Sequence, residues 1–144
     1  MKKLLPVALL FVSVASVAAD FSVTTTRTPT SIMGPGHSAF TRHQLRLSEY
    51  ARGAAMNSRL RGISWSATIF PESTGEEAKI CYRRDGVNET ACRAITPGER
   101  DSTDAFNHLG FSYATDVLIK HKAANGPWKS NPVGPESVTF HLTY

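Results

Sequence analysis

The two cysteines, Cys81 and Cys92, constrain the fold most strongly because they bracket a turn signal. If they face each other across two antiparallel strands, the pairing continues to Arg84 opposite Glu89 and leaves Gly86-Val87 as a two-residue turn. A type II′ turn needs glycine at its first central position, where φ is positive. Directly opposed strand residues also lie within disulfide range. The sequence therefore predicts a β-hairpin with a Cys81–Cys92 disulfide.

The first 19 residues predict export. Lys2 and Lys3 form a positive n-region, residues 4–17 are mostly apolar, and Val17-Ala18-Ala19 offers small residues for cleavage before Asp20. The apolar run is shorter than the roughly 18 residues that a membrane span needs, which disfavours the alternative of an uncleaved anchor. We expect a signal peptide over residues 1–19 and a mature chain that reaches the periplasm and then the cell surface, a fimbrium or the medium. A disulfide suits such an oxidising environment.

Alternating apolar and polar residues predict strands along most of the mature chain. The pattern occurs near residues 21–26, 63–69, 117–122 and 138–144. The last run is the clearest, with Val138, Phe140 and Leu142 expected on one buried face. Several short strands with a hairpin disulfide favour an all-β, antiparallel, immunoglobulin-like β-sandwich. A small barrel of the kind found in toxin binding subunits is the alternative.

The N-terminal part of the mature chain divides less clearly. Residues 40–57 fit either a short helix or a strand followed by a loop, and we favour the strand and loop. Pro29 and Gly34-Pro35-Gly36 indicate a loop or linker. We therefore expect a signal peptide (1–19), an N-terminal extension and linker (20–38), and a β-sandwich domain (39–144).

Composition and motifs argue against several classes of function. The five histidines are scattered and have no metal-ligand spacing, and no serine has the setting of a nucleophile. After loss of Lys2 and Lys3, 14 basic residues face 12 acidic ones, a net charge of about +2 that is too mild to predict nucleic-acid binding. We expect no enzymatic activity, no cofactor and no metal.

Two sets of residues are candidates for ligand binding. One is a cluster of arginines, and the other is an aromatic residue in a Gly/Pro-rich loop beside a lysine. Cations favour an acidic glycan or an anionic surface, and an exposed aromatic ring favours sugar stacking. The candidates are Arg42, Arg46, Arg59 and Arg61 in the first set and Trp128 and Lys129 in the second.

Both ends of the mature chain resemble those of chaperone–usher fimbrial subunits. The start, Asp20-Phe21-Ser22-Val23-Thr24-Thr25-Thr26, is similar to a donor strand, and residues 126–144 are similar to the closing strand. The resemblance implies an incomplete immunoglobulin-like sandwich that a periplasmic chaperone, and then a neighbouring subunit's strand, completes. It also implies that Phe21, Val23 and Thr25 are donor-strand residues and that an usher is a partner.

Two functions follow from these observations. The first is a structural or adhesive fimbrial subunit that assembles by donor-strand complementation with neighbouring copies or sister subunits and attaches to a host receptor. The second is a self-contained secreted binding module, similar to a toxin binding subunit or a surface coat protein. Strand addition uses main-chain hydrogen bonds for affinity. The two functions therefore differ in whether residues 20–30 pair with their own sheet.

Overall fold

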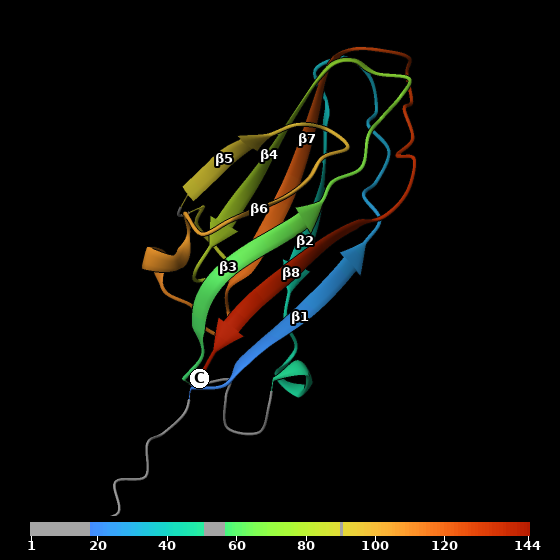
Figure 1. The fold of residues 1–144 in the computed structure, drawn as a ribbon. Coiled ribbons are helices and arrows are strands. Elements are labelled where there is room, and N and C mark those ends of the chain that lie inside the picture. The colour runs from blue at the N-terminus through green and yellow to red at the C-terminus, as the bar shows by residue number, and fades with distance from the viewer. Residues whose placement is uncertain (1–17, 51–56, 90) are drawn as a thin grey trace, which may run out of the picture.

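The structure, a computed structural model, describes residues 18–50, 57–89 and 91–144, so the expected signal peptide lies almost entirely outside it (Figure 1). Within these ranges, two short 3₁₀ helices, η1 (Leu47–Glu49) and η3 (Asn107–Leu109), accompany the strands. No helix in the described ranges is long and apolar enough to cross a membrane. The strands are β1 (Asp20–Arg27), β2 (Ser38–Gln44), β3 (Arg59–Ser66), β4 (Thr74–Arg83), β5 (Ala91–Ile95), β6 (Arg100–Thr103), β7 (Asp116–Asn125) and β8 (Glu136–Thr143).

The strands form two antiparallel sheets, which confirms the predicted all-β sandwich. The first sheet has the order β1-β8-β3-β6 and the second has the order β2-β7-β4-β5. Most consecutive strands alternate between the sheets, and this order is that of a jelly roll, an eight-stranded member of the sandwich class. Strand alternation in the sequence does not distinguish this connectivity from an immunoglobulin-like one, because both bury one face of each strand.

Strand β1 lies at the edge of the first sheet and pairs with the chain's own β8. Pairing runs from Asp20 opposite Thr143 to Arg27 opposite Glu136, without a register shift. We expected residues 20–38 to be an extension ahead of the domain, whereas residues 20–27 are part of its sheet. An alternating strand pattern looks the same whether its partner lies in the same chain or in a neighbour, so the sequence does not distinguish the two.

The linker expected over residues 29–38 is fixed to the domain. The backbone N–H of Ile32 donates to the Ser130 carbonyl at 2.9 Å, and the Ser130 N–H returns a bond of 2.9 Å to Ile32. Ile32 is buried in a small cluster with Ala39, Phe70 and Ala123. The loop therefore anchors β1 and β2 to the β7–β8 connection.

The structure confirms the disulfide hairpin but has a different turn at its end from the one predicted. Cys81 faces Cys92 in the β4–β5 register and the two are bonded. Gly86 has φ of 71°, as predicted. The prediction of a two-residue turn is wrong, because Arg84 and Glu89 lie outside the strands in a longer loop. The Asp85 carboxylate shapes this loop by accepting the backbone N–H groups of residues 87 and 88.

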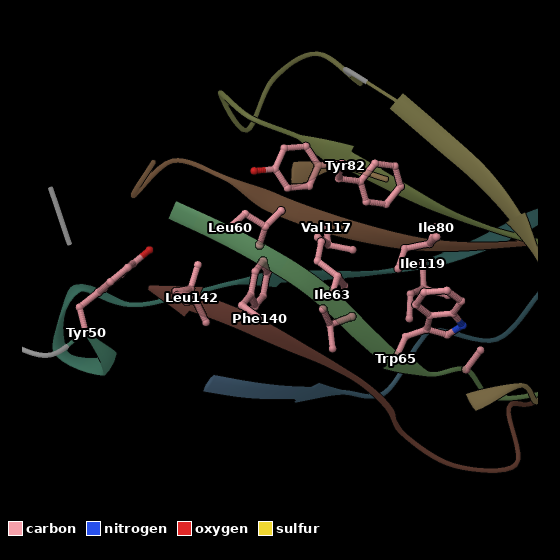
Figure 2. Close-up of a cluster of buried hydrophobic side chains, with 14 residues drawn as sticks. Tyr50, Leu60, Ile63, Trp65, Ile80, Tyr82, Val117, Ile119, Phe140 and Leu142 are labelled. Atoms are coloured by element: carbon pink, nitrogen blue, oxygen red, sulfur yellow. The ribbon is translucent and has the colours of Figure 1, made fainter. Parts of the chain in front are cut away.

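The main core lies between the two sheets (Figure 2). Val138, Phe140 and Leu142 are buried as predicted, and Trp65 joins them from β3. Ile69, the last apolar residue of the alternating run over residues 63–69, is 38% exposed, because β3 ends at Ser66. Alternation fails where the chain leaves the sheet.

Residues 40–50 follow the strand-then-loop expectation. They comprise most of β2 and the η1 turn, and Phe40 is 59% exposed on the strand. The remaining part of that segment, residues 51–56, lies outside the described residues.

Candidate functional site

The outer face of the second sheet carries an unusual row of side chains. In the strand register, Phe40 on β2 is opposite Lys120 on β7, and Lys120 is opposite Lys79 on β4. Neighbouring strands lie about 4.8 Å apart, and like charges directly opposite each other are unfavourable. The next position on β7 that points to this face is Lys122, opposite Glu77. The row therefore concentrates positive charge beside an exposed aromatic ring.

These residues line an open groove with a volume of about 950 Å³. Its walls come from the edges β2 and β5 and its floor from β4 and β7. The chain has four lysines beyond residue 19, and three of them, Lys79, Lys120 and Lys122, line this groove. Glu77 lies opposite Lys122 on the same face. The side chains of Arg93 and Glu76 point to the inner face, where Arg93 contacts the Trp65 ring and Glu76 contacts His121. The groove is thus a cationic surface on a protein of nearly balanced charge.

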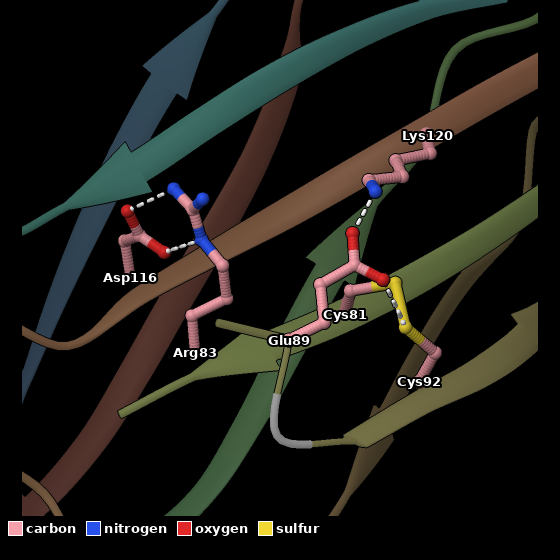
Figure 3. Close-up of a disulfide and its surroundings, with 6 residues drawn as sticks. All are labelled: Cys81, Arg83, Glu89, Cys92, Asp116 and Lys120. Carbon is pink, nitrogen blue, oxygen red and sulfur yellow. Dashed lines mark hydrogen bonds and ion pairs between the residues drawn. A yellow bond between two sulfur atoms is a disulfide. The ribbon is translucent and has the colours of Figure 1, made fainter. Parts of the chain in front are cut away.

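Lys120 occupies the centre of the positive row. Its ammonium forms an ion pair with Glu89, which reaches over from the hairpin loop beside the disulfide (Figure 3). Burial lowers the pKa of Lys120, and the neighbouring cations Lys79 and Arg83 lower it further. An anionic ligand in the groove would relieve this repulsion.

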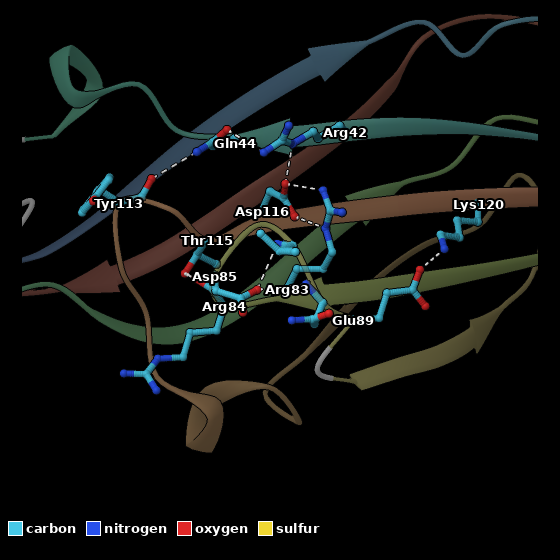
Figure 4. Close-up of polar contacts among 12 residues, drawn as sticks. Arg42, Gln44, Arg83, Arg84, Asp85, Glu89, Tyr113, Thr115, Asp116 and Lys120 are labelled. Carbon is cyan, nitrogen blue, oxygen red and sulfur yellow. Dashed lines mark hydrogen bonds and ion pairs between the residues drawn. The ribbon is translucent and has the colours of Figure 1, made fainter.

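A second cationic cluster lies on the same face, next to the groove. Asp116 is fully buried and accepts two hydrogen bonds from Arg83, at 2.6 Å to each carboxylate oxygen, and one from Arg42 (Figure 4). The carboxylate raises the pKa of Arg83 by hydrogen bonding. Two guanidinium groups share one carboxylate, so the cluster carries a net positive charge.

Behind the groove, a histidine is held between two carboxylates. His121 Nδ1 lies 2.6 Å from Glu76 Oε1, and its Nε2 lies 2.5 Å from Glu136 Oε1. Glu76 also accepts the Phe70 N–H, and Glu136 accepts the Thr68 N–H. Burial lowers the pKa of the His121 imidazole, but the hydrogen bonds and charges of Glu136 and Glu76 outweigh it and raise the pKa overall.

The same network continues to the edge of the first sheet. Thr41 donates to Glu136 Oε2 at 2.6 Å, so its oxygen accepts from His43 Nε2 at 3.0 Å. His43 Nδ1 lies 2.8 Å from the Thr25 hydroxyl, which also contacts the Val138 carbonyl at 3.5 Å. Burial lowers the pKa of His43 to about 4, so its imidazole is neutral at pH 7. An unbroken polar run therefore crosses the sandwich from Thr25 on β1 to Glu76 on β4.

The outer face of the first sheet is rich in hydroxyl groups. His141 contacts the Ser22 hydroxyl with Nδ1 at 2.8 Å and the Ser64 hydroxyl with Nε2 at 2.7 Å. Both ring nitrogens are occupied by hydroxyls, so this arrangement lacks the carboxylate that orients the histidine of a Ser-His-Asp triad. It can hold the three strands together by hydrogen bonds between side chains.

The residues predicted to bind a ligand do not form one surface. Arg42 lies on β2 in the second sheet, while Arg59 and Arg61 lie on β3 in the first sheet. Arg46 precedes η1. The remaining two candidates, Trp128 and Lys129, lie in the loop between β7 and β8, where Trp128 is 77% exposed.

Sequence reasoning missed the groove lysines, although a signal was present. Lys120 and Lys122 alternate with the inward-facing Ile119 and His121, so both point to the opposite face of β7. Lys79 occupies the outward position next to Cys81 on β4. Lys79 lies beside Lys120 only because β4 pairs with β7, and these two strands are distant in the sequence.

Comparisons with known proteins give a fold but no family. No protein-family model matches the chain, and no curated protein matches it. The crystal structure of FlhE is similar, with a TM-score of 0.61 and 13% identity over 85% of this chain and 96% of that chain. Desmodium yellow mottle tymovirus gives a TM-score of 0.42 and 12% identity over 96% of this chain and 93% of that chain, which supports no argument. The likeness to FlhE shows a shared fold alone.

Proposed function

We propose that this protein is an exported, self-contained binding module that binds an acidic glycan in the groove of the second sheet. The observation that carries the proposal is the row Phe40–Lys120–Lys79, in which an exposed ring and two adjacent cations line one open groove. Lys122 extends the positive charge along the same groove.

The chemistry of the groove favours a glycan with carboxylate or sulfate groups. A shallow, open groove suits an extended chain better than a small enclosed ligand. The lysines offer point charges to acidic groups, and the phenyl ring of Phe40 offers an apolar surface to the C–H face of a sugar ring. Because these charges are exposed to solvent, binding should weaken as the ionic strength increases.

The pairing of β1 within its own sheet supports a self-contained module. All eight positions of β1 have partners in β8, and the Ile32–Ser130 contacts close the loop that follows β1. With β1 in place, β8 has a strand on each side, so the proposed module needs no donor strand from a neighbour at this position.

The groove lysines can be tested with a sulfated glycan. We expect the mature protein to bind a heparin oligosaccharide and the double variant Lys79→Gln/Lys122→Gln to bind about tenfold more weakly, a difference of about 1.4 kcal/mol. Isothermal titration calorimetry at low ionic strength measures both affinities.

A matched control separates the groove from overall charge. The double variant Lys129→Gln/Arg59→Gln removes the same charge from candidates outside the groove and should keep its affinity within about twofold. Equal losses in the two double variants would show that the oligosaccharide responds to net charge, and the groove proposal would be wrong.

A second candidate function is the fimbrial one, and a specific observation favours it. β1 is an N-terminal edge strand, and within the described chain its neighbour in the sheet is β8 alone. Phe21 and Val23 are only partly buried there, as an exchangeable strand would allow. In this proposal β1 leaves β8 and pairs with a neighbouring copy or sister subunit, with a periplasmic chaperone and an usher as partners.

Sizing the mature protein distinguishes the two functions. We expect a monomer in analytical ultracentrifugation, whether or not a periplasmic chaperone is co-expressed, because β1 already has its partner. Polymers that form only after co-expression would instead support strand exchange and host attachment by a fimbria.

A further inference from the structure

The centre of the groove is already occupied by an acidic side chain of the protein itself. Glu89 lies in the loop between β4 and β5, and its carboxylate forms an ion pair with the Lys120 ammonium (Figure 3). In the strand register Lys120 lies between Phe40 and Lys79, in the row that carries the proposed glycan site. A carboxylate of the chain therefore lies where that site would hold an acidic group of its ligand.

We propose that Glu89 is an internal substitute for the ligand: it fills the anion position at Lys120 in the free protein, and an acidic glycan binds by displacing it. This inference rests on the proposed function. It names the central anion position of the same site and the contact that controls access to it. Lys79, Lys122 and the Phe40 ring then contact the neighbouring parts of the glycan chain.

The Glu89 carboxylate is held weakly enough to be exchanged. Its side chain is 34% exposed, and Lys120 is its one cationic partner within the described chain. Its other carboxylate oxygen lies 3.2 Å from Cys92 Sγ, a disulfide sulfur that has no proton to donate. Solvent-exposed ion pairs contribute little to stability, so this pair can separate at small cost.

A buried carboxylate on the same face shows the contrast. Asp116 is fully buried, and its two oxygens accept hydrogen bonds from Arg83 and Arg42 (Figure 4). Displacing it would leave a buried charge without its partners, which is strongly unfavourable. An anionic ligand therefore finds an exchangeable partner at Lys120 and not at the two arginines.

Lys120 favours an anion whichever molecule supplies it. Lys79 lies directly opposite on β4. Burial lowers the pKa of Lys120, and the charges of Lys79 and Arg83 lower it further. A carboxylate or sulfate group that reaches this ammonium offsets the repulsion between the cations. Glu89 and the ligand therefore compete for one ammonium group.

The affinity of a Glu89→Gln variant tests this competition. Glutamine keeps the size of the side chain but has no charge to pair with Lys120. We expect the variant to bind a heparin oligosaccharide about fivefold more tightly than the mature protein does. Isothermal titration calorimetry at low ionic strength measures both affinities, and an unchanged affinity would overturn the inference.

Glu77→Gln is the matched control in the same groove. Glu77 is opposite Lys122 in the strand register, but it forms no ion pair with any residue that the structure describes. Its replacement removes the same charge without freeing an ammonium group, so the affinity should stay within about twofold of that of the mature protein. Equal gains in the two variants would show that the groove responds to its total charge, and the displacement of Glu89 would be wrong.

Carbodiimide cross-linking follows the displacement directly. The reagent joins a carboxylate to an amine in contact with it, so an amide bond forms between Glu89 Cδ and Lys120 Nζ and the elements of water leave with the reagent. We expect mass spectrometry to find this cross-link in the free mature protein. A saturating dextran sulfate oligosaccharide, which has no carboxylate to react, should suppress it. An equal yield with the oligosaccharide bound would show that Glu89 stays on Lys120 and would overturn the inference.

The proposed function and the displacement of Glu89 fail in different experiments. Absence of binding of both oligosaccharides to the mature protein would contradict the proposed function. Binding that depends on Lys79 and Lys122, but that leaves the cross-link intact and is not strengthened by Glu89→Gln, would contradict the displacement alone.

Discussion

Replacement of Phe140 by alanine is expected to lower the free energy of unfolding by about 3–5 kcal/mol. The Phe140 side chain is completely buried, and in the strand register it lies between Val23 on β1 and Ile63 on β3. Its ring also meets Phe111 edge to face, with 6.1 Å between centroids. The cavity left by alanine would lie at the centre of the first sheet, and single domains are stable by only about 5–15 kcal/mol.

Thr139→Ala is the matched control for this prediction. Thr139 neighbours Phe140 on β8 but points to the outer face, where its hydroxyl meets that of Thr24 at 2.7 Å. We expect this variant to lose about 1 kcal/mol or less. Urea midpoints of the two variants and the parent protein provide the test. Small, equal shifts would show that β8 does not form the centre of the core.

The hairpin and β8 could be predicted because their determinants are local. The Cys81–Cys92 register rests on two residues of one hairpin and on the positive φ of Gly86. Gly86 is constrained further by a contact that the sequence does not reveal, since an added Cβ would lie 2.8 Å from the Ala114 carbonyl oxygen. Local sequence patterns therefore predicted the hairpin but not the longer loop at its end, which depends on contacts with another part of the chain.

The buried network and the groove could not be assembled from the sequence because their members come from distant strands. Glu136 shares the inward face of β8 with Val138, and His121 shares that of β7 with Ile119. Each was therefore identifiable as a polar residue at a buried position. Their contact depends on how the two sheets stack, which strand alternation does not specify.

Acidification is expected to remove about 3 kcal/mol of stability through His43 alone. The imidazole is completely buried, and burial lowers its pKa from 6.5 to about 4. Between these two pH values the unfolded chain binds a proton that the folded protein does not, so stability falls as pH falls from 6.5 towards 4. Each pKa unit corresponds to about 1.4 kcal/mol, which gives the expected loss.

His121 has the opposite sign and does not interfere in this window. Its raised pKa stabilises the fold fully below pH 6.5, and this contribution is lost only as pH rises through the raised value. The two buried histidines together predict a stability maximum near neutral pH. An acid-side loss that is specific to His43 can therefore be isolated by substitution.

Urea unfolding at about pH 7 and about pH 4.5 tests this prediction in three proteins. His43→Gln keeps a polar group between Thr25 and Thr41 but cannot take up a proton, so over this pH interval its loss should be smaller than that of the parent protein by about 2.4 kcal/mol. His108→Gln, which replaces an exposed histidine, should follow the parent protein. Because the comparison uses the change with pH within each protein, any loss of packing in the His43 variant cancels. Parallel pH profiles for the parent protein and His43→Gln would show that His43 titrates alike in the folded and unfolded chain, and that the polar run does not hold it neutral.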